Sequence, residues 1–278
     1  QPGCSPTPPQ GHTLTDPQPN DPRRALHSLI GWWADAGLET DIPVLPRAGA
    51  PVAAPAPAAR RPAPASAARQ QPAASPSSKP QQDARAMAAG ADSIEALQAA
   101  LAQYEGCALR FTATNTVFAR GNPSAPLMVI GEGPGADEDR QGLPFVGRSG
   151  QLLDRMLGAI GLDETGFHIT NVVYWRPPGN RKPSSEEIEA CRPFVERHIA
   201  LVKPRVILLA GGIAAQSLLN TPQGIMSLRG RWSEISAGGH TIPALPTFHP
   251  AFLLRRPQEK AHAWADLLSL AEKLEELG

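Results

Sequence analysis

Four short apolar runs, separated by stretches of helical length, constrain the fold of this chain more than any other feature. The runs are LMVIG (127–131), HITNVV (168–173), RVILLAG (205–211) and TIPALPTF (241–248). Strands joined through helices pair in parallel, with right-handed crossovers. The sequence therefore predicts a three-layer α/β/α domain with a central four-stranded parallel sheet.

This domain is expected to span residues 91–278. The chain has 278 residues, of which 41% are hydrophobic, and this is enough for a sizeable core. At its start, Asp92 and Glu95 have capping-box spacing, which predicts a helix with Ile94, Leu97 and Leu101 on one face.

The residues ahead of this domain differ in composition. Residues 46–90 are mostly Ala and Pro with Ser, Arg and Gln, so they have little to bury and predict a disordered linker. Residues 1–20 show no pattern and predict a disordered tail. Within 21–45, Pro22 and Gly37 delimit a short amphipathic helix. Its apolar face either docks on the main domain or recruits a protein partner.

Charge and cysteine content narrow the functional class. The formal net charge is zero, so a nucleic-acid partner must be argued from local arginine clusters. No run of 18 apolar residues is present, so no membrane span is expected. The amino end lacks a secretory pattern and three cysteines are too few for a disulfide framework, so we expect a cytoplasmic protein, nucleoid-associated if bacterial.

Polar residues follow the predicted strands. The glycine-rich stretch GEGPG (131–135) follows the first run, Asn171 lies near the end of the second, and PTFHP (246–250) ends the fourth. Ligands bind beyond the carboxyl ends of the strands in open parallel sheets, so these groups are expected to share one site. The glycine spacing matches neither a dinucleotide fingerprint nor a P-loop, so no nucleotide cofactor is expected.

Four motifs in this order and spacing resemble the family 4 uracil-DNA glycosylases, over roughly residues 104–270. They are GEGPGADEDRQGLPFVGRSGQLL, ITNVVYWRPPGNRKP, ACRPF and FHPAFLLRRP. The resemblance implies a monofunctional DNA repair enzyme of base excision repair. Such an enzyme flips uracil out of DNA, hydrolyses its N-glycosidic bond and leaves an abasic site, with free uracil as product.

The resemblance also implies roles for individual residues. Phe145 is expected to stack on uracil, and Asn171 to read its Watson–Crick edge. His249 is expected to stabilise charge that develops on uracil O2, aided by a backbone amide near Gly133.

Three of the acids that follow the first strand are candidate site residues. Glu132 is the first candidate to position the attacking water and Asp137 the second, whereas Glu138 is expected to brace the loop and shape the pocket. For each acid the alternative is a carboxylate that only organises the loop.

The last motif is expected to contact DNA. Leu253 and Leu254 are candidates for a wedge that fills the gap left by the flipped nucleotide. The predicted phosphate contacts are Arg148, Ser149, Arg176, Arg181, Lys182, Arg255 and Arg256. For any single arginine, an ordinary solvated charge is the alternative.

The chain departs from the family at the iron-sulfur ligands. The resemblance places four cysteine ligands at positions 104, 107, 175 and 191, but only Cys107 and Cys191 are cysteines, and Tyr104 and Trp175 occupy the other two. Two thiolates cannot replace a four-thiolate shell, so neither a cluster nor any other metal or cofactor is expected. The two thiols are expected to be buried and close in space.

Alternatives to the enzyme remain at this stage. One is a binding module for uracil or abasic DNA with little hydrolytic activity. A hydrolase of free nucleosides is disfavoured by the arginines after His249. A related subgroup that traps its product covalently carries a histidine in a loop after the second motif. The corresponding stretch, RPPGNRKPSSEE (176–187), contains none, so the resemblance implies hydrolysis and no covalent product. We expect the protein to act as a monomer.

Overall fold

A six-stranded sheet forms the centre of the protein. The computed structural model describes residues 79–277, so the predictions for residues 1–45 and for most of the linker lie outside the described residues. The strand order is β1-β3-β2-β4-β6-β5. The inner four strands are parallel, and β1 and β5 pair antiparallel at the two edges. The predicted four-stranded parallel sheet is confirmed, with an antiparallel strand added at each edge. The strands are β1 (Arg120–Gly121), β2 (Leu127–Gly131), β3 (Phe167–Asn171), β4 (Val206–Ala210), β5 (Ser233–Ala237) and β6 (His240–Thr247).

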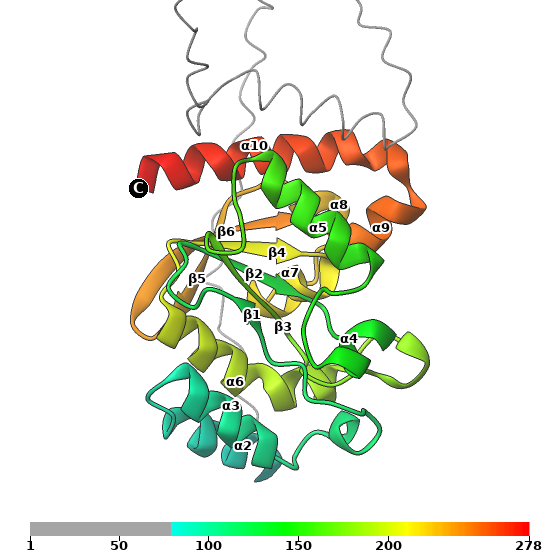
Figure 1. Ribbon diagram of the computed structural model, residues 1–278. Coiled ribbons are helices and arrows are strands. Elements are labelled where there is room, and N and C mark those ends of the chain that lie inside the picture. Colours follow the sequence, from blue (N-terminus) through cyan, green and yellow to red (C-terminus); the bar gives the residue numbers. More distant parts are fainter. Residues whose placement is uncertain (1–78, 278) are drawn as a thin grey trace, which may run out of the picture.

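Helices cover both faces of the sheet and make three layers (Figure 1). Helices α5, α9 and α10 pack on one face, α6 and α7 pack on the other, and α2 and α3 lie against α6 on the side away from the sheet. Strands β2, β3 and β4 are buried along their whole length, which explains why β2 and β4 appear in the sequence as continuous apolar runs, whereas β3 also carries the buried polar residues His168, Thr170 and Asn171. The helices are α2 (Lys79–Ala89), α3 (Ile94–Gln103), α4 (Ala136–Gln141), α5 (Arg148–Ala159), α6 (Ser185–Val202), α7 (Gly212–Leu218), α8 (Ile225–Leu228), α9 (Pro250–Arg255) and α10 (Lys260–Leu277).

The start of the folded domain differs from the prediction. Residues 79–89, assigned to the disordered linker, form helix α2, and its Ala84 and Ala88 are buried against the rest of the domain. The helix predicted from Asp92 exists as α3, but Ser93 is its N-cap, and the Ser93 hydroxyl accepts a hydrogen bond from the Ala96 amide at 3.1 Å. The first of these corrections adds α2 to the packed domain.

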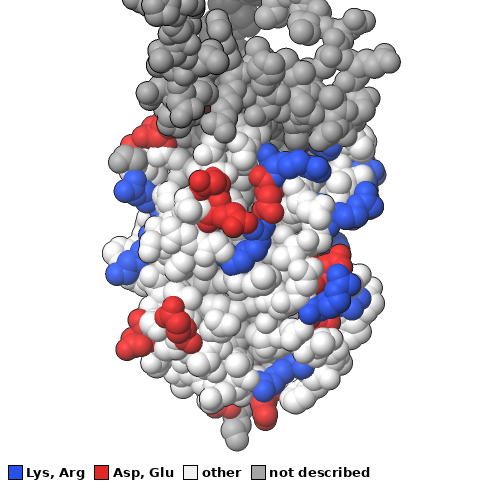
Figure 2. Space-filling view, in the orientation of Figure 1, with Lys and Arg blue, Asp and Glu red and all other residues white. Residues whose placement is uncertain are grey.

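Charged side chains of both signs alternate over the surface. On the face shown in Figure 2, acidic and basic groups are interspersed among uncharged residues, and neither sign dominates. This agrees with the formal net charge of zero. Within residues 79–277, no helix is both long and apolar enough to cross a membrane.

Candidate active site

A cavity of about 440 Å³ opens at the carboxyl ends of the parallel strands. Residues that follow β2, β3 and β6 meet there, although about 120 residues of sequence separate the first from the last. The predicted site therefore forms a single cavity. It is lined by Glu132, Gly133, Pro134, Gly135, Glu138, Phe145, Ser149, Asn171, Pro177, Asn180, Arg181, Lys182, Pro183, His249, Ala251 and Arg255.

His249 is the N-cap of α9, and its ring is held in one tautomer. The Nδ1 atom accepts a hydrogen bond from the Ala251 amide at 3.1 Å. Burial, assisted by the positive charge of Arg255, lowers the His249 pKa from 6.5 to about 4. The ring is therefore neutral near pH 7. With Nδ1 acting as acceptor, the single ring proton lies on Nε2, which makes Nε2 a hydrogen-bond donor.

The strand end that carries His249 is anchored from α10. The Thr247 hydroxyl donates to Asp266 Oδ2 at 2.8 Å, and Asp266 also pairs with Arg229. The Arg229 guanidinium in turn lies over the Phe248 ring, 5.4 Å from its centroid. Since Thr247 and Phe248 directly precede His249, this network fixes the backbone from which the imidazole extends.

Asn171 supplies an unpaired acceptor at the end of β3. Its side chain is buried, and its Oδ1 atom has no hydrogen-bond partner among the described residues. A Cβ on Gly131 would lie 2.5 Å from this oxygen and 2.5 Å from the Phe145 ring. Glycine at 131 therefore allows the amide and the ring to approach each other. A buried amide without a partner is suited to a ligand with complementary polar atoms.

Phe145 provides the aromatic surface of the cavity. Its ring is roughly parallel to the His249 imidazole, with an interplanar angle of 29° and centroids 5.5 Å apart. Its backbone is left-handed, with φ of 55°, which is rare for a residue with a large side chain. Phe145, Asn171 and His249 thus line the same cavity, as the sequence predicted.

Glu138 holds the glycine-rich loop in place. Its carboxylate accepts hydrogen bonds from the amides of Gly135 at 3.1 Å, Val146 at 3.0 Å and Gly147 at 2.9 Å. It thereby ties the start of α4 to the segment that follows Phe145. This is the geometry expected of a bracing residue.

The two candidate acids occupy different environments. Glu132 lines the cavity, and burial raises its pKa above 4.5, although the positive charges of Lys182 and Arg255 oppose the shift. Asp137 instead accepts a hydrogen bond from Arg140 at 2.7 Å and is not among the lining residues. The geometry favours Glu132 over Asp137 as the acid that acts in the cavity.

Only part of the predicted phosphate-binding set borders the cavity. Ser149, Arg181, Lys182 and Arg255 line it. Arg181 is also paired with Glu187 through two hydrogen bonds of 2.8 and 2.6 Å. The other three residues lie outside the lining: Arg148 is exposed, Arg176 donates to Asn180 Oδ1, and Arg256 lies over the Phe252 ring.

The prediction that Leu253 is a wedge residue is wrong. The Leu253 side chain is 0% exposed and belongs to the core between α9 and the sheet. It cannot enter a DNA duplex without unfolding α9. Leu254 is half-buried beside it, so it is the one of the pair that remains a candidate.

The positions that correspond to cluster ligands form a packed core. The Sγ atoms of Cys107 and Cys191 are 4.0 Å apart and both residues are buried, as expected. The hydrogen bond to Cys107, together with burial, raises the Cys191 pKa well above 9.0. The Tyr104 ring packs on Phe194 with centroids 5.1 Å apart, and Trp175 Nε1 donates to Thr116 Oγ1 at 3.0 Å. Two thiols beside a phenol and an indole do not fit an iron-sulfur cluster.

Several residues that shape the site were not predicted. Asn180 and Pro183 line the cavity from the loop before α6. Asp139 accepts hydrogen bonds from the amides of Thr114 and Asn115 and so ties α4 to a distant segment. Arg120 contacts the backbone of Phe145. No local sequence pattern marks Asp139 and Arg120, because these partners lie 24 or more residues away in the chain.

Comparisons with known proteins agree with this geometry. The model of the uracil DNA glycosylase superfamily matches residues 118–268. The type-4 uracil-DNA glycosylase of Archaeoglobus fulgidus is 38% identical over 170 residues, which cover 60% of this chain and 85% of that protein. The type-4 enzyme of Pyrobaculum aerophilum is 35% identical over 178 residues (63% and 91%), and that of Thermotoga maritima is 39% identical over 150 residues (54% and 77%).

Proposed function

This chain belongs to the uracil-DNA glycosylase superfamily, and we propose that it removes uracil from DNA with the residues of the cavity described above. It is a DNA repair enzyme that hydrolyses the N-glycosidic bond of uracil and leaves an abasic site. One observation carries the assignment of the site: Phe145, Asn171 and His249, from three separate parts of the chain, line one cavity of about 440 Å³.

Recognition follows from the unpaired amide of Asn171. A flipped uracil that stacks on Phe145 presents N3–H and O4 at its Watson–Crick edge. Asn171 Oδ1 accepts from N3–H, and its amide group donates to O4. Cytosine has the opposite pattern at these two atoms, so it would leave buried polar groups unpaired, and discrimination of this kind is strong.

Bond cleavage is assisted by the neutral imidazole. When the bond between C1′ and N1 breaks, its electron pair goes to uracil and negative charge grows on O2. His249 Nε2–H donates a hydrogen bond to this oxygen. The bond to C1′ then forms from a water oxygen, and the carboxylate of Glu132 positions the water and receives its proton. The uracil anion then takes up a proton from solvent and leaves as free uracil, Glu132 returns its proton to solvent, and the DNA is left with an abasic site.

DNA contacts are assigned to the basic residues at the cavity. Lys182 and Arg255 line it and carry the charge needed to hold the phosphates beside the flipped nucleotide. Leu254 is the proposed wedge. We also propose that the protein acts as a monomer.

We also propose that no iron-sulfur cluster takes part. The support is the filled volume around Cys107 and Cys191, where Tyr104 and Trp175 pack as core residues that are 2% and 1% exposed. None of the catalytic steps above requires a metal.

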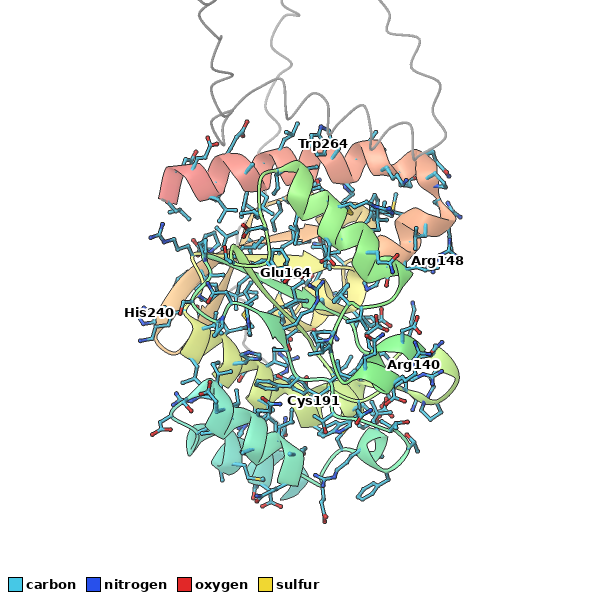
Figure 3. All side chains as sticks on the ribbon, viewed as in Figure 1. Arg140, Arg148, Glu164, Cys191, His240 and Trp264 are labelled. Atoms are coloured by element: carbon cyan, nitrogen blue, oxygen red, sulfur yellow. The ribbon has the colours of Figure 1, made fainter. Side chains whose placement is uncertain are left out.

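The experiment is a uracil-release assay under single-turnover conditions. Oligonucleotides with one uracil, one cytosine or one thymine are compared, as single strands and as duplexes. We expect base release only from the oligonucleotide that contains uracil. The rate of this release should fall by about two orders of magnitude in His249→Ala and should be strongly reduced in Asn171→Ala. His240→Ala is the matched control, because His240 is exposed and lies on the opposite side of the molecule from Arg148 and Arg140 (Figure 3). Tight binding of uracil DNA without release would instead identify a binding module.

A further inference from the structure

The backbone conformation of Phe145 requires a cause. A left-handed φ of 55° costs about 1 kcal/mol or more for a residue with a side chain, and it persists only where neighbouring groups hold it. In this protein the conformation directs the aromatic ring toward His249 and the cavity. Whatever holds the Phe145 backbone therefore also determines where the ring lies.

The amide side of this segment is held by Glu138, and the carbonyl side is held by Arg120. Arg120 Nε donates to the Pro144 carbonyl at 2.8 Å, and Nη2 donates to the Phe145 carbonyl at 3.2 Å. The planar guanidinium presents several donors in a fixed fork, so it can hold two successive carbonyls in a way that a single ammonium group cannot.

Arg120 is itself fixed by two further contacts. Its Nη2 atom pairs with Asp154 Oδ1 on α5 at 2.5 Å, and its guanidinium lies over the Phe167 ring of β3, 5.7 Å from the centroid. The Arg120 side chain is only 12% exposed, so the carbonyl contacts are largely shielded from water. The Phe145 carbonyl oxygen also lies directly against Gly150 of α5, where an added Cβ would be 1.7 Å from it, so close packing restrains the carbonyl as well.

We propose that Arg120 is a positioning residue for uracil excision, which holds the Pro144–Phe145 backbone so that the Phe145 ring forms the base-stacking surface. Arg120 is not among the lining residues of the cavity, so it acts only through Phe145. This inference rests on the proposed function, because the ring matters only if a base stacks on it. A misplaced stacking surface lowers the rate of the chemical step without removing any group that reacts.

The test is a double-mutant cycle on the single-turnover rate of uracil release. Arg120→Gln is expected to lower this rate about tenfold, and Arg120→Lys to restore only part of the loss because it has one donor group instead of a fork. Phe145→Leu removes the ring but keeps an apolar side chain. In the Phe145→Leu background, Arg120→Gln is expected to lower the rate less than about twofold, because the ring through which it acts is gone.

Binding to an abasic duplex supplies a readout that a general structural defect would change. This DNA has no base to stack, so Arg120→Gln should bind it as tightly as the unaltered protein does. Arg197→Gln is the matched control: Arg197 also donates two hydrogen bonds to a backbone carbonyl, that of Ala91, at 2.8 and 2.6 Å, but it lies on α6 away from the cavity. Thermal unfolding of each variant records the stability cost separately.

The outcomes are distinct. A tenfold effect of Arg120→Gln that persists undiminished in the Phe145→Leu background would overturn the proposal, as would a loss of abasic-DNA binding equal to the loss of rate. Absence of uracil release by the unaltered protein would instead contradict the proposed function and leave no rate to compare.

Discussion

The Nδ1 atom of His249 and the backbone amide of Ala251 lie 3.1 Å apart in a hydrogen bond that fixes the imidazole as a neutral donor. In the proposed reaction the ring donates a hydrogen bond and never has to take up a proton. Its lowered pKa, about 4, means that the ring stays in this form throughout the neutral and mildly acidic range.

The acid limb of the pH-rate profile should therefore belong to Glu132. Burial raises the Glu132 pKa above 4.5, so the carboxylate is lost as pH falls through that raised value, while His249 is still neutral. As the pH is lowered, we expect the single-turnover rate to begin to fall while the pH is still above 4.5. In Glu132→Gln the rate should be about a hundredfold lower and this limb should disappear. If the acid limb of the pH-rate profile is unchanged in Glu132→Gln, a group other than Glu132 causes it. Circular dichroism at each pH distinguishes this loss of rate from unfolding of the protein.

Two core histidines predict a second effect of acid, on stability. His168 Nε2 and His198 Nε2 are 2.9 Å apart, and burial lowers both pKa values, that of His168 from 6.5 to about 4. Between pH 6.5 and 4 the unfolded chain binds more protons than the folded one, so stability falls as pH falls. The titration of His168 alone should lower the free energy of unfolding by roughly 2 kcal/mol at pH 5 relative to pH 7. Urea unfolding across this range measures the loss.

The variant His168→Leu/His198→Leu provides the control for that effect. It removes both titrating groups, so its free energy of unfolding should depend less on pH between 6.5 and 4 than that of the unaltered protein. Equal pH dependence in the two proteins would show that other groups cause the acid lability.

Leu253 and Leu254 should separate stability from DNA contact. Leu253→Ala leaves a cavity in the core and should lower the free energy of unfolding by about 3 kcal/mol, with little change in the rate per folded molecule. Leu254→Ala should cost less stability and slow uracil release from duplexes more than from single strands, since only a duplex needs a wedge. The reverse pattern would return the wedge role to Leu253.

The thiol pair gives a prediction about metal content. The purified protein should contain no iron and no visible absorption band, and Cys107→Ala/Cys191→Ala should keep uracil release while losing some stability from the core. Tyr104→Cys/Trp175→Cys creates four thiols at the ligand positions of the related family and should acquire iron on reconstitution. Iron in the unaltered protein in stoichiometric amount would refute the cofactor-free proposal.

The inner part of the fold was predictable because its physical cause is local. Strands β2, β3 and β4 are buried on both faces, so β2 and β4 are continuous apolar runs in the sequence, whereas β3 also carries buried polar residues. Parallel pairing then brings the residues after each strand to one edge. This is why a shared location for Asn171 and His249 could be predicted without coordinates, whereas the place of Phe145 beside them was implied by the resemblance to the family.

The features that were missed depend on distant partners or on ambiguous composition. Strand β1 has two residues and no periodicity, and β5 is an alternating edge strand. Helix α2 is rich in alanine, which suits a linker as well as a helix, and only the i, i+4 spacing of Ala84 and Ala88 shows that one face is buried. The inward direction of Leu253 is decided by how α9 packs on the sheet, which no motif encodes.

Gly131 ends β2 between the Asn171 amide and the Phe145 ring. A Cβ at this position would lie only 2.5 Å from each of the two groups. If position 131 were randomised, selection for uracil repair should return glycine codons almost exclusively. Clones with alanine should fold into the same sheet but lack uracil repair, because the added carbon would displace Asn171 and Phe145, the two groups proposed to recognise the base.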